Sequence, residues 1–250
     1  MPDAPDWLVR EPFTDTDLGP LRSGKEAQID LVERTGADGR SCLLVRKRFA
    51  PRTVRHKGEL EALGLQRTSA FRHDDLYRRG QGFRFSRDRR AVERRSQWGR
   101  QVLREQWTGN ELDVLRRLWS AGVTVPYPVD GTTDELVMEF VGDRHGAAPQ
   151  LASARLRGGR LAEAWDQLVD ALRAMTAIGV VHADLSAFNL LWWDERLWVI
   201  DLPQAIDLAL HPEGLDLLHR DVLNIATWFA RRGLRHDPEA VFADLVARAC

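Results

Sequence analysis

Several features are scarce in this chain, and each scarcity excludes a class of protein. Only two cysteines occur among the 250 residues, Cys42 and Cys250, and they lie far apart in the sequence. They provide neither the spacing of a zinc site nor the cysteine density of a disulfide-stabilised domain. No apolar run approaches the roughly 20 residues that a transmembrane helix needs, and the first residues lack the pattern of a signal peptide. We therefore expect a globular, cytoplasmic protein with no membrane partner.

An excess of charge of one sign is also missing. The formal net charge is -1, with 36 basic and 37 acidic residues, so the whole molecule has no strong attraction for nucleic acid or acidic membranes. The balance conceals an asymmetry. Residues 1–125 hold 25 basic and 18 acidic residues, net +7, whereas residues 126–250 hold 11 and 19, net -8. Such a division suits a cleft that holds polyphosphate on one side and metal ions on the other.

Lysine is the scarcest basic residue. Arginine supplies nearly all the positive charge, and the three lysines are Lys25, Lys47 and Lys57. A retained lysine therefore indicates a position that needs a compact ammonium group. Lys47 follows the apolar run 42–45, and from the end of that predicted strand it could reach nucleotide phosphates. Glu111 is the preferred helix partner and Glu105 is its rival, while a solvated lysine at a strand end is the alternative interpretation.

The N-terminal half predicts strands followed by a helix. Residues 1–17 are expected to form a flexible lead-in, because the first 20 residues hold four prolines and five acidic residues. Alternating apolar residues over 27–32 and the run 42–45 predict antiparallel strands, joined by a turn at 36–39. A helical pattern follows over 92–121. A strand over 135–141 then ends at Gly142, where we expect the boundary between two lobes.

The C-terminal half predicts helices around a hairpin. An amphipathic helix is expected over 161–178, capped by Gly179. A hairpin follows, with strands at 190–193 and 198–200 around Asp194, Glu195 and Arg196, and further helices run from about Leu215. The prediction is an α+β protein with an N-terminal lobe at 18–142 and a C-terminal lobe at 143–250.

The residues that indicate chemistry surround this hairpin. His182 to Asn189 has the pattern H-x-D-x-x-x-x-N, and Asp201 follows twelve residues later, after an apolar strand. Phosphoryl transfer needs a carboxylate near the attacking hydroxyl and oxygen ligands that hold magnesium against the nucleotide phosphates. Asp184 is the candidate base, and Asn189 and Asp201 are candidate metal ligands. Taken singly, these residues could instead cap a turn, occupy a left-handed loop position and end a strand.

Taken in order, the motifs over residues 18–230 resemble those of the RIO family of atypical serine/threonine kinases, in particular its RIO1-like members. The similar segments are the phosphate-covering loop Ser23-Gly24-Lys25-Glu26-Ala27, the strand-lysine segment Val45 to Phe49, the hinge Leu136 to Gly142, the catalytic loop His182 to Asn189, the metal-binding loop Ile200 to Ala205, and the later segments His211-Pro212 and Arg220 to Asn224.

The resemblance implies a bilobal protein-kinase-like fold, with a small N-terminal antiparallel-sheet lobe and a reduced helical C-terminal lobe. It also implies ATP and Mg²⁺, or alternatively Mn²⁺, as cofactors. The adenine would be bound by backbone groups of Glu139 and Val141, and the metal by Asn189 and Asp201. The residues that the resemblance assigns to ATP are Ser23, Gly24, Lys25, Glu26, Lys47, Glu111, Met138, Glu139 and Val141.

The chain departs from the family's pattern within its catalytic loop. Ala187 and Phe188 stand where the family usually has Glu-Tyr, so a carboxylate is missing beside the catalytic loop. Ala183 stands where ordinary protein kinases carry an arginine that binds a phosphorylated activation loop, which argues against regulation of that kind. The segment after Asp201 lacks the DFG glycine and the A-P-E motif of ordinary kinases. The substrate platform is therefore expected to be reduced.

Three functions are compatible with these motifs. The preferred one is an ATP- and Mg²⁺-dependent serine/threonine kinase, including autophosphorylation, whose protein substrate the sequence does not identify. The resemblance also allows an ATPase that assists ribosome or RNA assembly, with Asp201 itself accepting phosphate. A small-molecule kinase is the third, because the pattern around Asp184 and Asp201 also occurs in antibiotic and choline kinases.

The arginine-rich segment Arg84–Arg104 provides a candidate partner surface. It contains eight arginines interleaved with Phe85 and Trp98. Arginine pairs with phosphates and stacks on bases, so the segment could bind RNA or a ribosomal particle. A solvated basic face is the alternative.

Overall fold

The computed structural model describes residues 4–23, 27–49, 110–132 and 135–249. The chain divides into two compact units. The N-terminal unit comprises residues 5–110 and 129–138, and the C-terminal unit comprises residues 1–4, 111–128 and 139–250. The predicted N-terminal lobe, residues 18–142, includes residues 111–128 and 139–142, which belong to the C-terminal unit. Residues 110–120 form a helix, within the range 92–121 for which the sequence predicts one.

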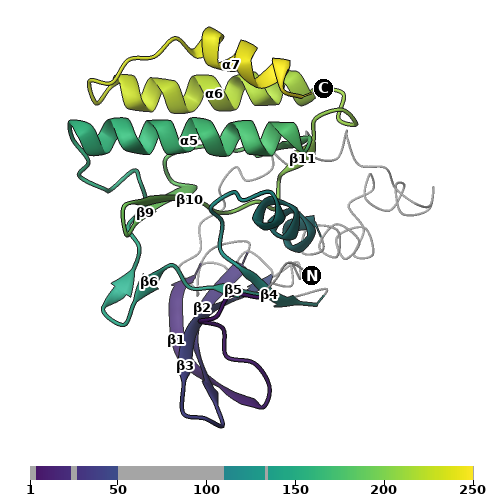
Figure 1. Ribbon diagram of the computed structural model, residues 1–250, viewed down its shortest axis with the longest axis vertical. Helices are drawn as coiled ribbons and strands as arrows, with labels where there is room; N and C mark the ends of the chain where they lie inside the picture. The colour runs from purple at the N-terminus through teal and green to yellow at the C-terminus, as the bar shows by residue number, and fades with distance from the viewer. Residues whose placement is uncertain (1–3, 24–26, 50–109, 133–134, 250) are drawn as a thin grey trace, which may run out of the picture. The chain divides into compact units, whose positions relative to one another are not determined.

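A five-stranded sheet forms the N-terminal unit, with the strand order β1-β2-β3-β5-β4 (Figure 1). Its strands are β1 (Phe13–Ser23), β2 (Ala27–Gly36), β3 (Ser41–Phe49), β4 (Pro128–Gly131) and β5 (Glu135–Glu139). The pairs β1–β2 and β2–β3 are antiparallel, and the second register places Ile29 opposite Lys47. The predicted strands at 27–32 and 42–45 are thus confirmed and extended, while the strand predicted over 135–141 ends at Glu139.

Strand β1 replaces part of the lead-in that the sequence predicts. The strand begins at Phe13 and lies at the edge of the sheet, where a proline such as Pro20 is tolerated because an edge strand leaves some N–H groups outside the ladder. Two shifts of register occur along its pairing with β2. Its acidic residues have specific partners: Arg34 donates to both carboxylate oxygens of Asp15, over 2.8 and 2.9 Å. The acidic residues that predict a flexible lead-in therefore stabilise the pairing of β1 with β2.

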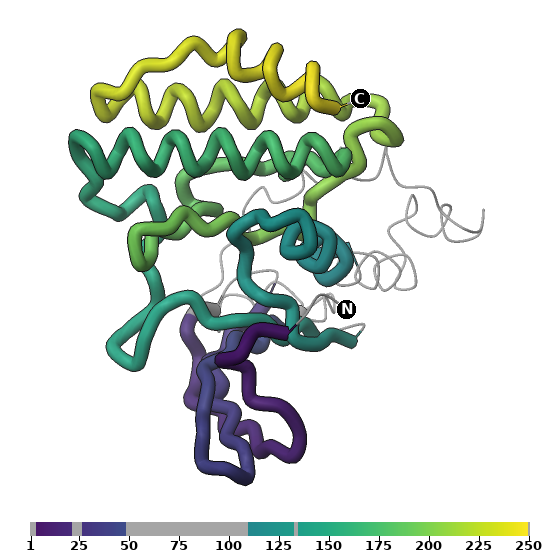
Figure 2. Tube along the Cα trace, in the orientation of Figure 1, coloured from purple at the N-terminus to yellow at the C-terminus, as the bar shows by residue number. Residues whose placement is uncertain are grey.

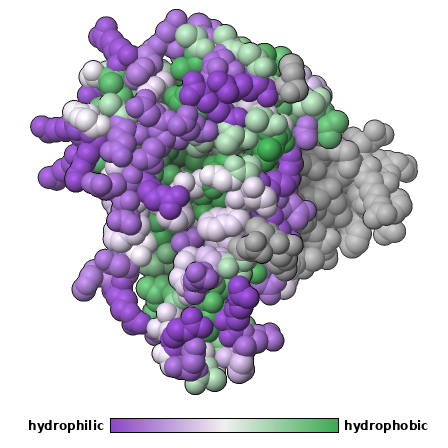
Figure 3. All heavy atoms as spheres, viewed as in Figure 1, coloured by the Kyte–Doolittle hydropathy of each residue, from purple (hydrophilic) through white to green (hydrophobic). Residues whose placement is uncertain are grey.

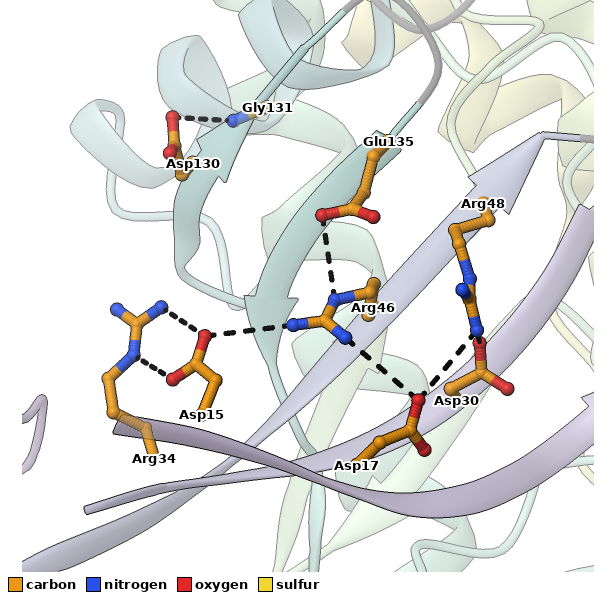
Figure 4. A network of polar contacts seen from close by, with 9 residues as sticks. All are labelled: Asp15, Asp17, Asp30, Arg34, Arg46, Arg48, Asp130, Gly131 and Glu135. Carbon is orange, nitrogen blue, oxygen red and sulfur yellow. Dashed lines mark hydrogen bonds and ion pairs between the residues drawn. The ribbon is translucent and has the colours of Figure 1, made fainter. Parts of the chain in front are cut away.

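An ionic network covers one face of this sheet (Figure 4). Arg46 lies 3.5 Å from Glu135 and 3.7 Å from Asp15, and Arg48 contacts Asp30 on the neighbouring strand. Although burial acts in the opposite direction, hydrogen bonds led by the one from Arg48 hold the pKa of the Asp30 carboxyl below its usual value. Because side chains alternate along a strand, the residue between Arg46 and Arg48 faces the other side of the sheet. That residue is Lys47.

Three helices dominate the C-terminal unit: α5 (Gly159–Ala177), α6 (Gly214–Ala230) and α7 (Pro238–Ala247), which lie side by side in Figure 1. Trp165 of α5 joins them, since its ring packs edge-on against Phe229 of α6 at 5.1 Å and stacks on His236 at 4.3 Å. Helix α5 ends as predicted. Gly179 has a φ of 72°, and its N–H donates to Thr176 O, an arrangement that glycine adopts more readily than other residues.

Short strands connect the helices, and Figure 2 traces the chain from α5 through them into α6. They are β6 (Gly142–Asp143), β7 (Gly146–Ala147), β8 (Val180–Val181), β9 (Leu190–Trp193), β10 (Arg196–Val199) and β11 (Ile206–Asp207). The predicted hairpin is β9–β10, but its turn contains only Asp194 and Glu195, both with positive φ, and Arg196 pairs with Trp193.

Among the described residues, no helix is both long and apolar enough to span a bilayer.

Candidate active site

The loop between β8 and β9 holds the candidate base. Asp184 is half-buried, and its backbone carbonyl accepts a hydrogen bond of 2.8 Å from the Asn189 side-chain amide. The same amide nitrogen lies 3.4 Å from Asp184 Oδ2. Within the described part of the chain, no other residue donates a hydrogen bond to this carboxylate. Asp184 is therefore positioned through its main chain, which leaves carboxylate oxygens available for a hydroxyl group.

Backbone hydrogen bonds bring the residues beside Asp201 back to the loop that contains Asp184. The Ile200 N–H donates to Asn189 O over 3.0 Å, and His182 Nε2 donates to Ile200 O over 3.1 Å. Asp201 is the next residue, with an exposed side chain and a φ of 63°. The β9–β10 hairpin thus returns Asp201 to the neighbourhood of Asn189, as its position in the sequence predicts.

A buried carboxylate on α6 fixes the backbone around Asp184. Asp221 accepts from the Ala183 N–H over 2.7 Å and from the Leu185 N–H over 3.1 Å, and Arg220 donates to Ala183 O. These bonds hold Ala183 in a left-handed conformation, with a φ of 62°. Burial raises the pKa of the Asp221 carboxyl, while His182, Arg220 and the two N–H donors oppose that rise.

The sequence motifs do not indicate this role of Asp221, although the residue lies in a segment that resembles the family. A pattern in the helix could have revealed it. Asp221 occupies the apolar face of α6, among Leu217, Leu218, Val222 and Ile225, all of which are buried. An acidic residue on such a face must find hydrogen-bond donors there, because an unpaired buried charge is costly.

The donor atoms at this site fit a magnesium ion. The Asn189 side-chain nitrogen is committed to Asp184 O, which leaves the amide oxygen to act as a ligand, and Asp201 supplies a carboxylate. Mg²⁺ prefers such hard oxygen ligands and usually completes its shell with water and substrate phosphates. Within the described ranges, no three His, Cys, Asp or Glu residues cluster to form a metal site. A metal held by Asn189 and Asp201 would therefore also need phosphate or water oxygens.

The two charged residues predicted to act as a pair are both buried. Lys47 of β3 is 6% exposed, and Glu111 of the helix 110–120 is 1% exposed. Lysine and glutamate are rarely buried to this degree unless they interact with other polar groups. Lys47 belongs to the N-terminal unit and Glu111 to the C-terminal unit. Their pairing with each other stays a prediction.

The predicted hinge follows β5. Glu139 and Tyr127 form two hydrogen bonds: the Glu139 N–H donates to Tyr127 O over 2.9 Å, and the Tyr127 N–H donates to Glu139 Oε2 over 3.0 Å. Burial raises the pKa of the Glu139 carboxyl, against the effects of the Tyr127 N–H and Arg196. The Val141 carbonyl accepts from the Ala148 N–H over 2.9 Å. These bonds fix the hinge backbone, and the roles of Met138, Glu139 and Val141 toward adenine stay predictions.

Some predicted residues cannot be placed. Ser23 is the last residue of β1. The predicted residues outside the described ranges are Gly24, Lys25 and Glu26 of the predicted phosphate-covering loop, the rival glutamate Glu105 and the segment Arg84–Arg104.

Comparison with known proteins decides the family. The model of the RIO domain matches residues 62–241, which is more than half of the chain. The chain belongs to the RIO family. Among its relatives is the RIO-type serine/threonine-protein kinase Rio1 of Haloferax volcanii, which is 31% identical over 236 residues, covering 94% of this chain and 70% of that protein. The Rio1 kinase of Thermoplasma acidophilum is 36% identical over 135 residues, covering 54% and 69%.

Other RIO proteins are longer than the matched region. Human RIO3 is 34% identical over 137 residues, which cover 54% of this chain but only 26% of RIO3. The crystal structure of the Rio2 kinase-ADP/Mg²⁺-phosphoaspartate complex from Chaetomium thermophilum matches with a TM-score of 0.62 and 18% identity, over 92% of this chain and 61% of that one. This structural likeness shows the fold. The predicted RIO membership, kinase-like fold and serine/threonine kinase class are thereby confirmed.

Proposed function

We propose that this RIO domain transfers the γ-phosphate of ATP, with Mg²⁺, to serine or threonine hydroxyls of a protein, including its own chain, in the cytoplasm. One observation carries the assignment of residues. The Ile200 N–H donates to Asn189 O and so joins the loop that contains Asp184 to the loop that contains Asp201. The first loop follows β8 and the second follows the β9–β10 hairpin, which is the order expected for phosphoryl transfer.

In this proposal each residue has a distinct task. Asp184 accepts a hydrogen bond from the substrate hydroxyl and takes its proton as the new O–P bond forms. The bond between the γ-phosphorus and the bridging oxygen then breaks, and its electron pair leaves with ADP. Lys47 binds the α- and β-phosphates and Glu111 orients it, while Ser23 to Glu26 cover the phosphates.

Asn189 and Asp201 would hold the metal, which when bound neutralises the charge on the phosphates. Asp221 keeps the Ala183 and Leu185 N–H groups satisfied, and so fixes the direction in which the intervening Asp184 projects. The backbone of Glu139 and Val141 would accept and donate the adenine hydrogen bonds, with Met138 adjoining them.

The test is magnesium-dependent ATP turnover by the purified chain, with protein-bound and free phosphate counted separately. Asp184→Ala and Asp201→Asn are compared with the wild type and with Asp166→Asn, which alters an exposed carboxylate on α5. Asparagine tolerates a left-handed conformation, so Asp201→Asn preserves the backbone at its φ of 63°. The proposal expects acid-stable phosphate on protein, lost in both site variants and retained in the control.

Other outcomes would identify other functions. Free phosphate, or a hydroxylamine-labile label that Asp201→Asn removes, would indicate an ATPase that forms an aspartyl phosphate. Turnover that requires an added metabolite would indicate a small-molecule kinase. ATP binding with no turnover under any of these conditions would contradict the proposed catalysis.

A further inference from the structure

Five exposed arginines form a basic surface on the C-terminal unit. This basic end surface consists of Arg155, Arg157, Arg231, Arg232 and Arg235. The two segments that carry them, 150–160 and 226–236, contain no acidic residue, although residues 126–250 as a whole have a net charge of -8. This positive charge is therefore concentrated locally within the acidic half of the chain.

Helix packing brings the two segments to the same end of the unit. Trp165, in the second turn of α5, contacts Phe229 at the end of α6 and His236 just beyond it. Arg232 closes the link, because its Nη2 donates to Ala152 O over 3.3 Å. Figure 3 shows that hydrophilic side chains cover this end of the unit, where α5 begins and α6 ends.

The positive charges of the basic end surface are not neutralised by described residues. None of its five arginines forms an ion pair with any residue that the structure describes. The nearby acidic groups are engaged elsewhere: Glu195 lies 3.0 Å from Arg160, and Glu239 lies 2.8 Å from His219. Asp237 accepts from the Glu239 N–H and so caps α7. The surface thus presents uncompensated positive charge to an external partner.

One residue connects this surface to the catalytic loop. Ala152 receives the Arg232 hydrogen bond at its carbonyl, and its N–H donates to Ala187 O over 2.9 Å. Two residues earlier, the Gln150 side chain donates to Phe188 O over 2.7 Å. The Phe188 side chain, which is 62% exposed, immediately precedes Asn189. The basic end surface is therefore linked to residues 187 and 188 of the loop that contains Asp184.

We propose that the basic end surface docks an acidic segment of the protein substrate, with Phe188 contacting an apolar side chain beside the acceptor residue. The inference rests on the proposed kinase function and deepens it by naming the substrate class. A peptide is favoured over RNA because the surface is continuous with the loop that would receive the hydroxyl. In addition, the guanidinium of Arg232 covers the Trp228 ring at 3.6 Å, and the same ring packs against Phe229. These contacts make the Trp228 ring less available for stacking on a nucleic-acid base.

The test compares peptides and charge-reversal variants of the full chain. One serine peptide carries aspartate and glutamate beside a leucine next to the serine, and its partner peptide carries lysine at the acidic positions. We expect the acidic peptide to have the higher kcat/KM. The double variant Arg155→Glu with Arg231→Glu should reduce its kcat/KM by about tenfold, mainly through KM, because two attractive charges on the surface become repulsive.

A matched control is Arg248→Glu, which reverses an exposed arginine just beyond α7, at the opposite end of this unit from the end of α6 (Figure 1). It should leave the peptide preference intact. Phe188→Ala should lower kcat/KM for the leucine peptide but not for a matched glycine peptide, and Phe188→Leu should restore it.

The possible failures can be told apart. Autophosphorylation without any preference for the acidic peptide, or a preference that survives the double variant, would overturn the docking inference and leave the kinase proposal standing. An RNA oligonucleotide of equal charge that binds more tightly than the peptide, and loses this affinity in the double variant, would assign the surface to RNA instead. No phosphate transfer to any protein or peptide would overturn the proposed function itself.

Discussion

Individual buried carboxylates determine much of the local geometry, and Asp221 is the clearest example. Its two oxygens accept hydrogen bonds from the N–H groups on either side of Asp184, so Asp221 positions the loop that contains the candidate base. Replacing a hydrogen-bond acceptor in a buried site leaves donors unsatisfied, which costs more than the net value of the bond.

Asp221→Ala should lower the free energy of unfolding by about 2–4 kcal/mol, because two buried N–H donors lose their acceptor. It should also reduce phosphate transfer more than ATP binding. Urea denaturation measures the first effect and nucleotide titration with turnover measures the second. Asn224→Ala, on the exposed side of the same helix, is the control and should be close to neutral. A stable Asp221→Ala variant with full activity would contradict this role.

Glu139 should make stability depend on pH. Burial raises its pKa above 4.5, so the folded state binds the proton more tightly than the unfolded state does. The wild type should therefore lose stability from this group as pH rises from about 4.5 through the raised pKa. Glu139→Gln removes the ionisation and keeps an acceptor for the Tyr127 N–H. Urea unfolding from pH 4 to 8 should show the stability of Glu139→Gln relative to the wild type rising over that window and then levelling off. A difference in unfolding free energy that does not change with pH would exclude the effect.

At the scale of elements, the hairpin after the hinge depends on close backbone contact. Gly142 in β6 has a φ of 146°, and a Cβ placed there would lie 2.5 Å from Gly146 O. Gly146, on the facing strand β7, has open space around the equivalent position. The two glycines of one hairpin therefore have different tolerances for a methyl group.

Gly142→Ala should destabilise the chain by about 1–3 kcal/mol, because alanine is strained at this φ and also meets backbone. Gly146→Ala should stay within about 0.5 kcal/mol of the wild type. Parallel urea denaturation curves test the pair. Equal effects of the two substitutions would show that the close approach of the strands does not determine stability here.

Sequence patterns predict the elements whose apolar residues have a clear period. They do not predict elements whose conformation depends on contacts with distant parts of the chain. The helix near 161–178 and its Gly179 cap follow from local sequence, and so do the strands near 27–32 and 42–45. The sequence does not predict strand β1, because Asp15 favours a strand only through its ion pairs with Arg34 and Arg46 on other strands. The hairpin turn was predicted one residue too long, because Asp194 and Glu195 adopt positive φ without a glycine to indicate it.

At the scale of the whole molecule, motif order was more informative than composition. The motifs in their order over residues 18–230 resemble those of the family that the comparisons confirm, whereas the net charge of -1 concealed the local excess of arginine on the C-terminal unit. Hydrogen bonds between distant residues, such as those from Ala183 and Leu185 to Asp221, could not be predicted because no local pattern specifies which donors a buried carboxylate meets.

MgATP should stabilise the whole chain if Asn189 and Asp201 bind it through a metal. At a ligand concentration of about 100 times Kd, binding adds about 2.7 kcal/mol, which corresponds to a rise in Tm of roughly 5–10 °C for a chain of this size. Asp201→Asn should remove the magnesium-dependent part of the shift, and Asp166→Asn should keep it. A shift that is identical with and without magnesium would contradict the metal assignment.

The attachment of the loop that contains Asp184 to α6 has a consequence for inactivation by heat. The Ala183 and Leu185 N–H groups depend on a carboxylate 36 or more residues further along the chain, so the loop cannot remain ordered once α6 opens. Local opening of a helix requires less free energy than unfolding of the whole molecule. Enzymatic activity should therefore report the integrity of α6, and it should disappear on warming before the heat absorption of global unfolding is seen by calorimetry.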